Sequence, residues 1–205
     1  MNGLSILRRM ALCGIASMLA APALAAPEGQ LPPRGPMIDY AMVFSFSQSQ
    51  NGQVETGRRG IAISGTRVRD EMLDGGNGDH RVFIGDKATG TVTAFDPADP
   101  DRKAVRAPMA DVLLPMADGY GRVMQTLGPP RALGSDTVAG RDCTVLRWQI
   151  GPDRQDWCVD SQGIVLRAVQ TVGPVETKFE ALTIRTGEQP ETLFRLPEGF
   201  TVEER

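Results

Sequence analysis

The stretch YAMVFSFS, residues 40–47, decides the fold class of this chain. Its large apolar side chains, Tyr40, Met42, Phe44 and Phe46, recur at every second position, and smaller residues stand between them. Because successive side chains of a β-strand point to opposite faces, this alternation predicts a strand with one strongly apolar face.

Further segments with strand-like patterns follow along the chain. They are residues 59–64, 66–73, 81–85, 91–95, 143–150, 156–159, 164–172, 176–185 and a short terminal edge at 193–197. Short turn-rich stretches separate them, so that most neighbours can pair as antiparallel hairpins. We find no internal repeat and no second domain boundary.

The middle of the chain changes to a helical period. Apolar residues fall on one helical stripe at Met109, Val112, Leu113, Met116, Tyr120, Val123, Met124 and Leu127. Pro115 predicts a break, a kink or the start of a second helix within it. Strands, then a short helical insert, then strands indicate an α+β fold: a curved, mostly antiparallel sheet with helix on one face.

The N-terminus has the pattern of a cleavable secretory signal peptide over residues 1–25. Arg8 and Arg9 precede an apolar run that is too short to span a bilayer, and Ala23-Leu24-Ala25 is a small-x-small cleavage site. The arginine pair leaves the general secretory and twin-arginine routes open. We expect export to the periplasm, a disordered or extended proline-rich leader at 26–36, and one domain over 37–205.

Composition excludes a nucleic-acid partner. The formal net charge of the whole chain is −3, and removal of Arg8 and Arg9 takes it to −5. A basic footprint for phosphate groups is therefore missing from the expected mature sequence.

Two cysteines, Cys143 and Cys158, remain after the expected cleavage. In an oxidising compartment this even number favours a disulfide, which would close a loop of about 15 residues. The alternative is two reduced, buried cysteines. A metal site is disfavoured because no second cysteine pair or histidine cluster accompanies them.

Residues that could carry catalysis are few. His80 is the one histidine, no nucleophile-elbow motif is present, and His80 is expected at the surface. Asp74 and Asp79 flank a glycine-rich loop but lack the spacing of a calcium-binding loop. We therefore expect no enzymatic activity, no cofactor and no metal.

Methionine is frequent in the expected mature chain. It stands at Met37, Met42, Met72, Met109, Met116 and Met124. Flexible methionine side chains either fill gaps in a core or line a pocket that accepts varied apolar shapes, and the sequence leaves both interpretations open.

Three motifs resemble those of a known group. VAGRDCTVLRW (138–148), DWCVDSQGIVLRA (156–168) and LFRLPEGF (193–200) resemble a family of uncharacterised bacterial periplasmic proteins that carry a domain-of-unknown-function label. Its architecture is similar to that of the outer-membrane lipoprotein carriers, the LolA/LolB-like superfamily. The resemblance implies an incomplete antiparallel β-barrel whose apolar concave face is covered by a short helical insert. No functional residue of a carrier can be matched by position.

The resemblance and the apolar faces together favour a non-enzymatic binding protein. We expect its ligand to be a lipid, an acyl chain, another hydrophobic small molecule or an acylated protein. The residues expected to hold it are Met42, Phe44, Phe46, Val68, Met72, Leu113, Met116, Met124, Leu146, Trp148 and Phe179. A monomer with transient contacts to outer-membrane or envelope proteins is expected. The alternative is a structural or sensory envelope protein that acts through protein contacts and has no ligand cavity.

Overall fold

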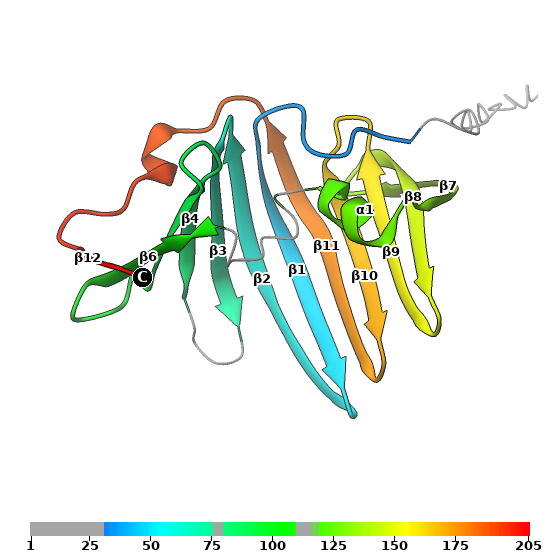
Figure 1. Cartoon of the computed structure of the whole chain (residues 1–205), viewed down its shortest axis with the longest axis horizontal. Helices are drawn as coiled ribbons and strands as arrows, with labels where there is room; N and C mark the ends of the chain where they lie inside the picture. The colour runs from blue at the N-terminus through cyan, green and yellow to red at the C-terminus, as the bar shows by residue number, and fades with distance from the viewer. Residues whose placement is uncertain (1–30, 76–79, 110–116, 118) are drawn as a thin grey trace, which may run out of the picture.

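The computed structural model describes residues 31–75, 80–109, 117 and 119–205 (Figure 1). Twelve strands form one curved sheet in the order β12-β6-β5-β4-β3-β2-β1-β11-β10-β9-β8-β7, and its two edges do not pair with each other. The strands are β1 Tyr40–Gln50, β2 Gln53–Ser64, β3 Arg67–Gly75, β4 Val82–Asp86, β5 Thr91–Phe95, β6 Lys103–Pro108, β7 Arg131–Val138, β8 Arg141–Ile150, β9 Asp153–Asp160, β10 Val165–Val172, β11 Val175–Thr186 and β12 Thr201–Glu204.

Strand β1 is central, between β2 and β11. Tyr40 is opposite Ile63 of β2 and Thr186 of β11. Tyr40, Met42 and Phe44 are at most 2% exposed, as their alternation predicts. Neighbouring strands are antiparallel except for β12, which runs parallel to β6. The predicted curved, mostly antiparallel α+β fold is confirmed.

The β1–β2 hairpin is longer than predicted. Strand β2 begins at Gln53, directly after a turn in which Asn51 and Gly52 have φ of 52° and 80°. An Asn-Gly pair favours this two-residue turn because both residues tolerate positive φ. That dipeptide was the signal in the sequence for the additional strand residues before position 59.

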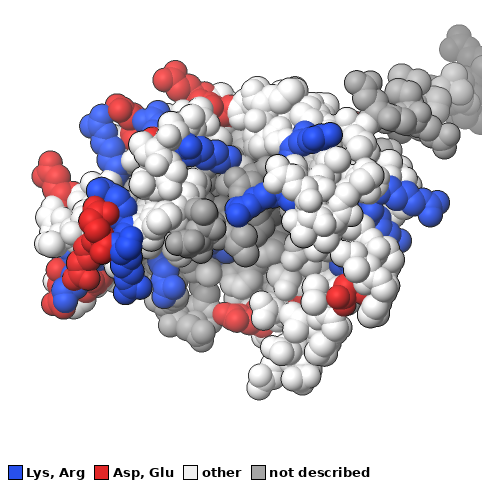
Figure 2. Space-filling view, in the orientation of Figure 1, with Lys and Arg blue, Asp and Glu red and all other residues white. Residues whose placement is uncertain are grey.

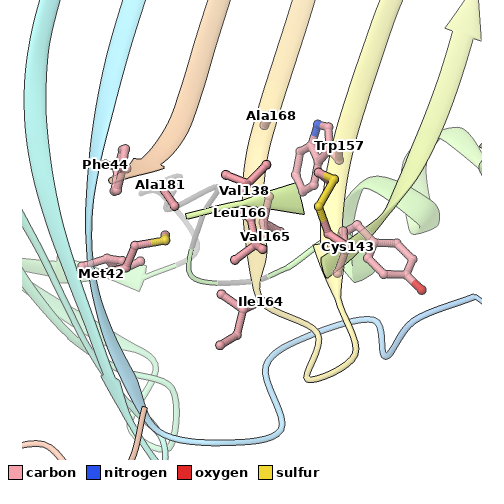
Figure 3. Close-up of a cluster of buried hydrophobic side chains, with 14 of the residues drawn as sticks. Met42, Phe44, Val138, Cys143, Trp157, Ile164, Val165, Leu166, Ala168 and Ala181 are labelled. Carbon is pink, nitrogen blue, oxygen red and sulfur yellow. A yellow bond between two sulfur atoms is a disulfide. The ribbon is translucent and has the colours of Figure 1, made fainter. Parts of the chain in front are cut away.

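The main core lies on the face of the sheet that carries Tyr40, Met42 and Phe44, which we call the concave face. The α-helix α1, Gly121–Leu127, lies over this face in front of β9 and β10 (Figure 1). Its Met124 and Leu127 pack against the buried cluster that Figure 3 shows in close-up. Of the predicted helical stripe, Gly121–Leu127 is helical as α1, and Met109 follows β6 and donates its N–H to the carbonyl of Gly90. Residues 110–116 and 118 of the stripe lie outside the described residues.

A second, smaller core lies on the opposite, convex face. Val82, Phe95 and Ala104 of β4, β5 and β6 are buried there. The C-terminal segment covers them with Leu196, Phe200 and Val202. The terminal edge strand predicted at 193–197 is wrong, because residues 191–194 form the 3-10 helix η2 and the strand comes later, as β12. Proline at positions 190 and 197 limits ladder pairing around η2.

Besides β12, two further strands escaped prediction. The edge strand β7 is exposed from Arg131 to Thr137, so it has no alternation to reveal it. In β6 only Ala104 is buried, and its small side chain gives a weak signal. Among the described residues, no helix is long and apolar enough to cross a membrane.

The disulfide between Cys143 of β8 and Cys158 of β9 is present, as predicted. The register sets Cys158 opposite Val145, so that the two cysteines form a diagonal pair on the face opposite to Leu146 and Trp157. The covalent bond therefore joins two strands whose other face contributes to the main core.

Residues 31–36, part of the expected leader, are held by hydrogen bonds. The Tyr120 hydroxyl donates to the carbonyl of Pro32, and the Gly121 N–H donates to that of Arg34 at 2.8 Å. Gly163, with φ of 79°, allows a close approach, because a Cβ there would be 2.1 Å from the Gly35 oxygen. This segment thus ties α1 and the β9–β10 turn together.

Candidate functional site

The concave face brings together most residues of the predicted binding site. Met42, Phe44, Val68, Leu146 and Trp148 are buried in one cluster. Met124 of α1 and Phe179 of β11 are partly buried against it. Leu113 and Met116 lie outside the described residues.

Phe46 and Met72 lie on the same face but beyond this cluster, and both are partly exposed. Phe46 is opposite Phe179 on one side and Gly57 on the other. A Cβ at Gly57 would be 2.5 Å from the Phe46 ring, so glycine there lets the ring lie across β2. The apolar row thus continues from the packed core into a partly exposed stretch, which we call the open end and which consists of Phe46, Met72 and Phe179.

Helix α1 is fastened above the cluster at its two ends. The Trp148 indole N–H donates to the carbonyl of Gly128, which caps the helix, at 2.9 Å. The centroids of the Tyr120 and Trp148 rings are 6.0 Å apart. No residue of the helix itself is fully buried. Gly119 and Gly128, both with positive φ, flank it, so the chain turns sharply before and after the helix.

A buried ion pair interrupts the apolar face. Asp70 of β3, 2% exposed, accepts two hydrogen bonds on one carboxylate oxygen from the Arg59 guanidinium, at 2.5 and 3.0 Å. Burial raises the pKa of Asp70 above its usual value, and the charge and hydrogen bonds of Arg59 oppose that rise. Sequence reasoning missed this pair, although Asp70 stands between Val68 and Met72 in the alternation.

Two polar atoms of the concave face lack a partner. Trp157 Nε1 and Gln155 Oε1 are buried and make no hydrogen bond within the described part of the chain. Both residues belong to β9, where the register places them opposite Leu146 and Trp148. Buried donors and acceptors are nearly always paired, so these two are exceptions.

Charged side chains are distributed unevenly over the molecule. In Figure 2, Lys, Arg, Asp and Glu side chains gather densely on the side of β4, β6 and β12, whereas on the side of α1 and β8–β10 they are fewer and more scattered. His80 is exposed. In the described ranges no group of three acidic, cysteine or histidine side chains is placed to hold a metal ion. The site offers apolar surface and hydrogen bonds more than acid–base chemistry.

The convex face also has a groove, of about 340 Å³, over the central strands. Its floor is made of small side chains such as Ala41, Val43 and Gly60, and Leu73 and Leu193 border it. None of the predicted site residues except Met42 borders this groove. Sequence reasoning missed this groove, because it considered the large apolar side chains of each strand, whereas the floor of the groove is formed by the small residues that alternate with them.

No protein-family model and no curated protein matches the chain, but solved structures match its fold. MucB matches with a TM-score of 0.53 and 16% identity, over 80% of this chain and 59% of MucB. The Pseudomonas aeruginosa MucA/MucB complex matches with a TM-score of 0.51 and 17% identity, over 78% of this chain and 56% of the matched chain. An uncharacterized conserved protein from Thermus thermophilus matches with 0.53 and 13%, over 80% of this chain and 91% of that one.

A LolA superfamily protein from Nitrosomonas europaea also matches, with a TM-score of 0.42 and 10% identity, over 79% of this chain and 92% of that one. The chain spans less than two thirds of MucB, and all these identities are low, so the likeness concerns the fold. The chain therefore shares its overall fold with MucB, and the incomplete antiparallel β-barrel that the motifs imply is present as one curved sheet whose edges do not pair.

Proposed function

We propose that this protein is a non-enzymatic periplasmic binding protein that holds an acyl chain or a similar apolar group on its concave face. The open end carries the proposal. Phe46, Met72 and Phe179 continue the apolar surface of the core, yet they remain partly exposed. An acyl chain laid along them would remove this surface from water.

The expected affinity follows from the area available. Each buried CH₂ group contributes about 0.8 kcal/mol, so ten carbons contribute about 8 kcal/mol before ordering costs. Binding in the micromolar range needs about 8 kcal/mol in total, so the chain must be held with little loss of freedom. The edge-to-face pair of Phe44 and Phe179, with centroids 5.8 Å apart, already fixes one of the rings.

The test is titration with a fluorescent fatty acid. Wild-type protein should bind it, and Phe46→Asp should weaken binding at least about tenfold, because a charge would stand where the chain lies. Phe44 is 1% exposed, so its substitution by Asp would disrupt folding and is unsuitable.

Val54→Asp is the matched control. Val54 is 66% exposed and belongs to the same hairpin, but alternation places it on the convex face. It should leave binding unchanged. Equal affinity of wild type and Phe46→Asp, with both folded, would contradict binding at the open end.

A protein partner is the second candidate. The complex of MucA with MucB, a protein of similar fold, favours it. The exposed edge strand β7 offers unpaired backbone groups to an added strand. Native mass spectrometry separates the two candidates: purified protein without lipid, together with no uptake of the fluorescent fatty acid, would favour action through protein contacts.

A further inference from the structure

The two tryptophans of the concave face differ in whether their indole N–H has a hydrogen-bond acceptor. Trp148 donates its indole N–H to Gly128, whereas the indole N–H of Trp157 has no acceptor among the described residues. Their rings touch edge to face with centroids 5.9 Å apart, so both belong to one packed cluster. Trp157 is 2% exposed, and water therefore does not satisfy its donor.

An unpartnered acceptor accompanies this donor. Gln155, two residues before Trp157 on β9, has a buried Oε1 without a partner in the described part of the chain. Side chains two apart share a face and are about 6.6 Å apart along a strand. An amide group that makes one hydrogen bond of about 2.9 Å through its oxygen and another through its N–H bridges a comparable distance between two side chains. In Figure 3 the Trp157 nitrogen is on the side of the ring away from Ile164 and Val165.

Because the two unpartnered atoms are neutral, they restrict the chemical class of ligand that can bind them. The buried ion pair of this face, Arg59 and Asp70, is internally neutralised and leaves no charge for a ligand to meet within the core. What remains is a neutral donor and a neutral acceptor. A carboxylate or an ester offers acceptors only, whereas an amide offers a carbonyl to Trp157 and an N–H to Gln155.

We propose that the ligand is an amide-linked acyl chain, whose amide oxygen accepts from Trp157 Nε1 and whose amide N–H donates to Gln155 Oε1. This inference rests on the proposed function, since it places the polar end of a chain that lies on the concave face. Both atoms are covered in the ligand-free fold, so the amide replaces the groups that cover them. Leaving them unpartnered costs free energy that the ligand recovers.

The test compares three probes of equal chain length: N-methyl dodecanamide, methyl dodecanoate and dodecanoate. Each competes with a fluorescent fatty acid for the protein. Wild type should bind the amide about tenfold tighter than the ester, as one additional hydrogen bond in a buried site implies. Gln155→Met should abolish that preference, and Trp157→Phe should weaken the amide and the ester alike.

Val54→Asp on the convex face is the control, and it should leave the amide-to-ester ratio unchanged. A second measurement uses only the wild-type protein, so it does not depend on whether a variant still binds. In a ¹H–¹⁵N spectrum, the amide should shift the Trp157 indole proton downfield more than that of Trp148.

The outcomes separate the two proposals. Equal affinity for amide and ester, or an unshifted Trp157 indole proton, would overturn the amide site while leaving acyl binding intact. Binding of none of the three probes, and of no fluorescent fatty acid, would overturn both.

Discussion

The two halves of the sheet are stabilised in different ways. In the half formed by β8–β11, apolar side chains of the concave face lie beneath α1, and the disulfide joins two of the strands. In the half formed by β4–β6, a second core lies on the convex face and is covered by the C-terminal segment. Charged side chains gather over this second half (Figure 2).

The difference teaches that one continuous sheet can change the face on which it is covered. Val82, Phe95, Ala104 and Val202 are paired in one row across four strands, and this row is on the convex face. Hairpins between neighbouring strands build both halves, but the core of the second half also depends on the C-terminal segment, which is distant in the chain. The two halves should therefore respond differently to substitution.

The largest effect is expected from removal of the disulfide. Cys143→Ser should lower the free energy of unfolding by about 3 kcal/mol, because the bond closes a loop of about 15 residues in the unfolded chain. Urea unfolding measures it. Reduction of the wild type should reproduce the loss, and reductant should have no further effect on Cys143→Ser. Full stability of the variant would show that packing alone holds β8 and β9.

The convex core offers the next test. The Phe200 ring contacts Phe95, with centroids 5.1 Å apart, and Arg102 lies over it. Phe200→Ala should cost about 2 kcal/mol, since a partly exposed ring loses less than a fully buried one. Hydrogen exchange should show faster opening of β6 and β12 than of β8–β10.

Val54→Ala is the control for this measurement, because Val54 is 66% exposed and should change stability by less than about 0.5 kcal/mol. Equal acceleration of exchange in both halves would mean that the sheet opens as one unit, and the comparison of halves would then fail.

Asp70 should produce a smaller effect that depends on pH. Its raised pKa means that the native state binds this proton more readily than the unfolded state does. Wild-type stability therefore decreases through this group as pH rises above about 4, by at most about 1.4 kcal/mol per pH unit. Asn does not titrate, so Asp70→Asn should gain stability relative to wild type as pH rises through that window.

Comparing the two proteins at each pH isolates Asp70 from other carboxylates. Asp74 and Asp136, whose pKa values are lowered by hydrogen bonds from Arg58 and Arg167, contribute with the opposite sign in both proteins. A relative loss of Asp70→Asn with rising pH would show that Arg59 outweighs burial.

Sequence patterns predicted the interior strands of the sheet better than the strands at or next to its two edges. Alternation in residues 40–47 predicted the strand and its buried face, and the cysteine pairing followed from their number. Strand β12 could not be predicted, because its partner β6 is distant in the chain and parallel to it. Strand β7, exposed along nearly its whole length, carries no pattern.

The site was predictable as a set of apolar residues but not in its polar detail. Trp148 and Trp157 stand in similar strand-like segments on either side of one turn, yet only the fold reveals that one indole has an acceptor. The same holds for Asp70, whose burial with Arg59 depends on the register between β2 and β3. Hydrogen-bond partners distant in the chain decide both cases.

The smallest expected effect concerns the attachment of α1, and it sharpens the contrast between the two tryptophans. Trp148→Phe and Trp157→Phe both leave a smaller ring in the cluster and lose the same ring volume, but only Trp148→Phe also removes an N–H that holds Gly128. Trp157→Phe removes a donor that has no acceptor among the described residues, so Trp148→Phe should cost about 1 kcal/mol more than Trp157→Phe. The two changes delete the same atoms on the same face, and urea unfolding compares them directly. Equal losses from both would show that ring packing, and not the hydrogen bond, fastens the helix.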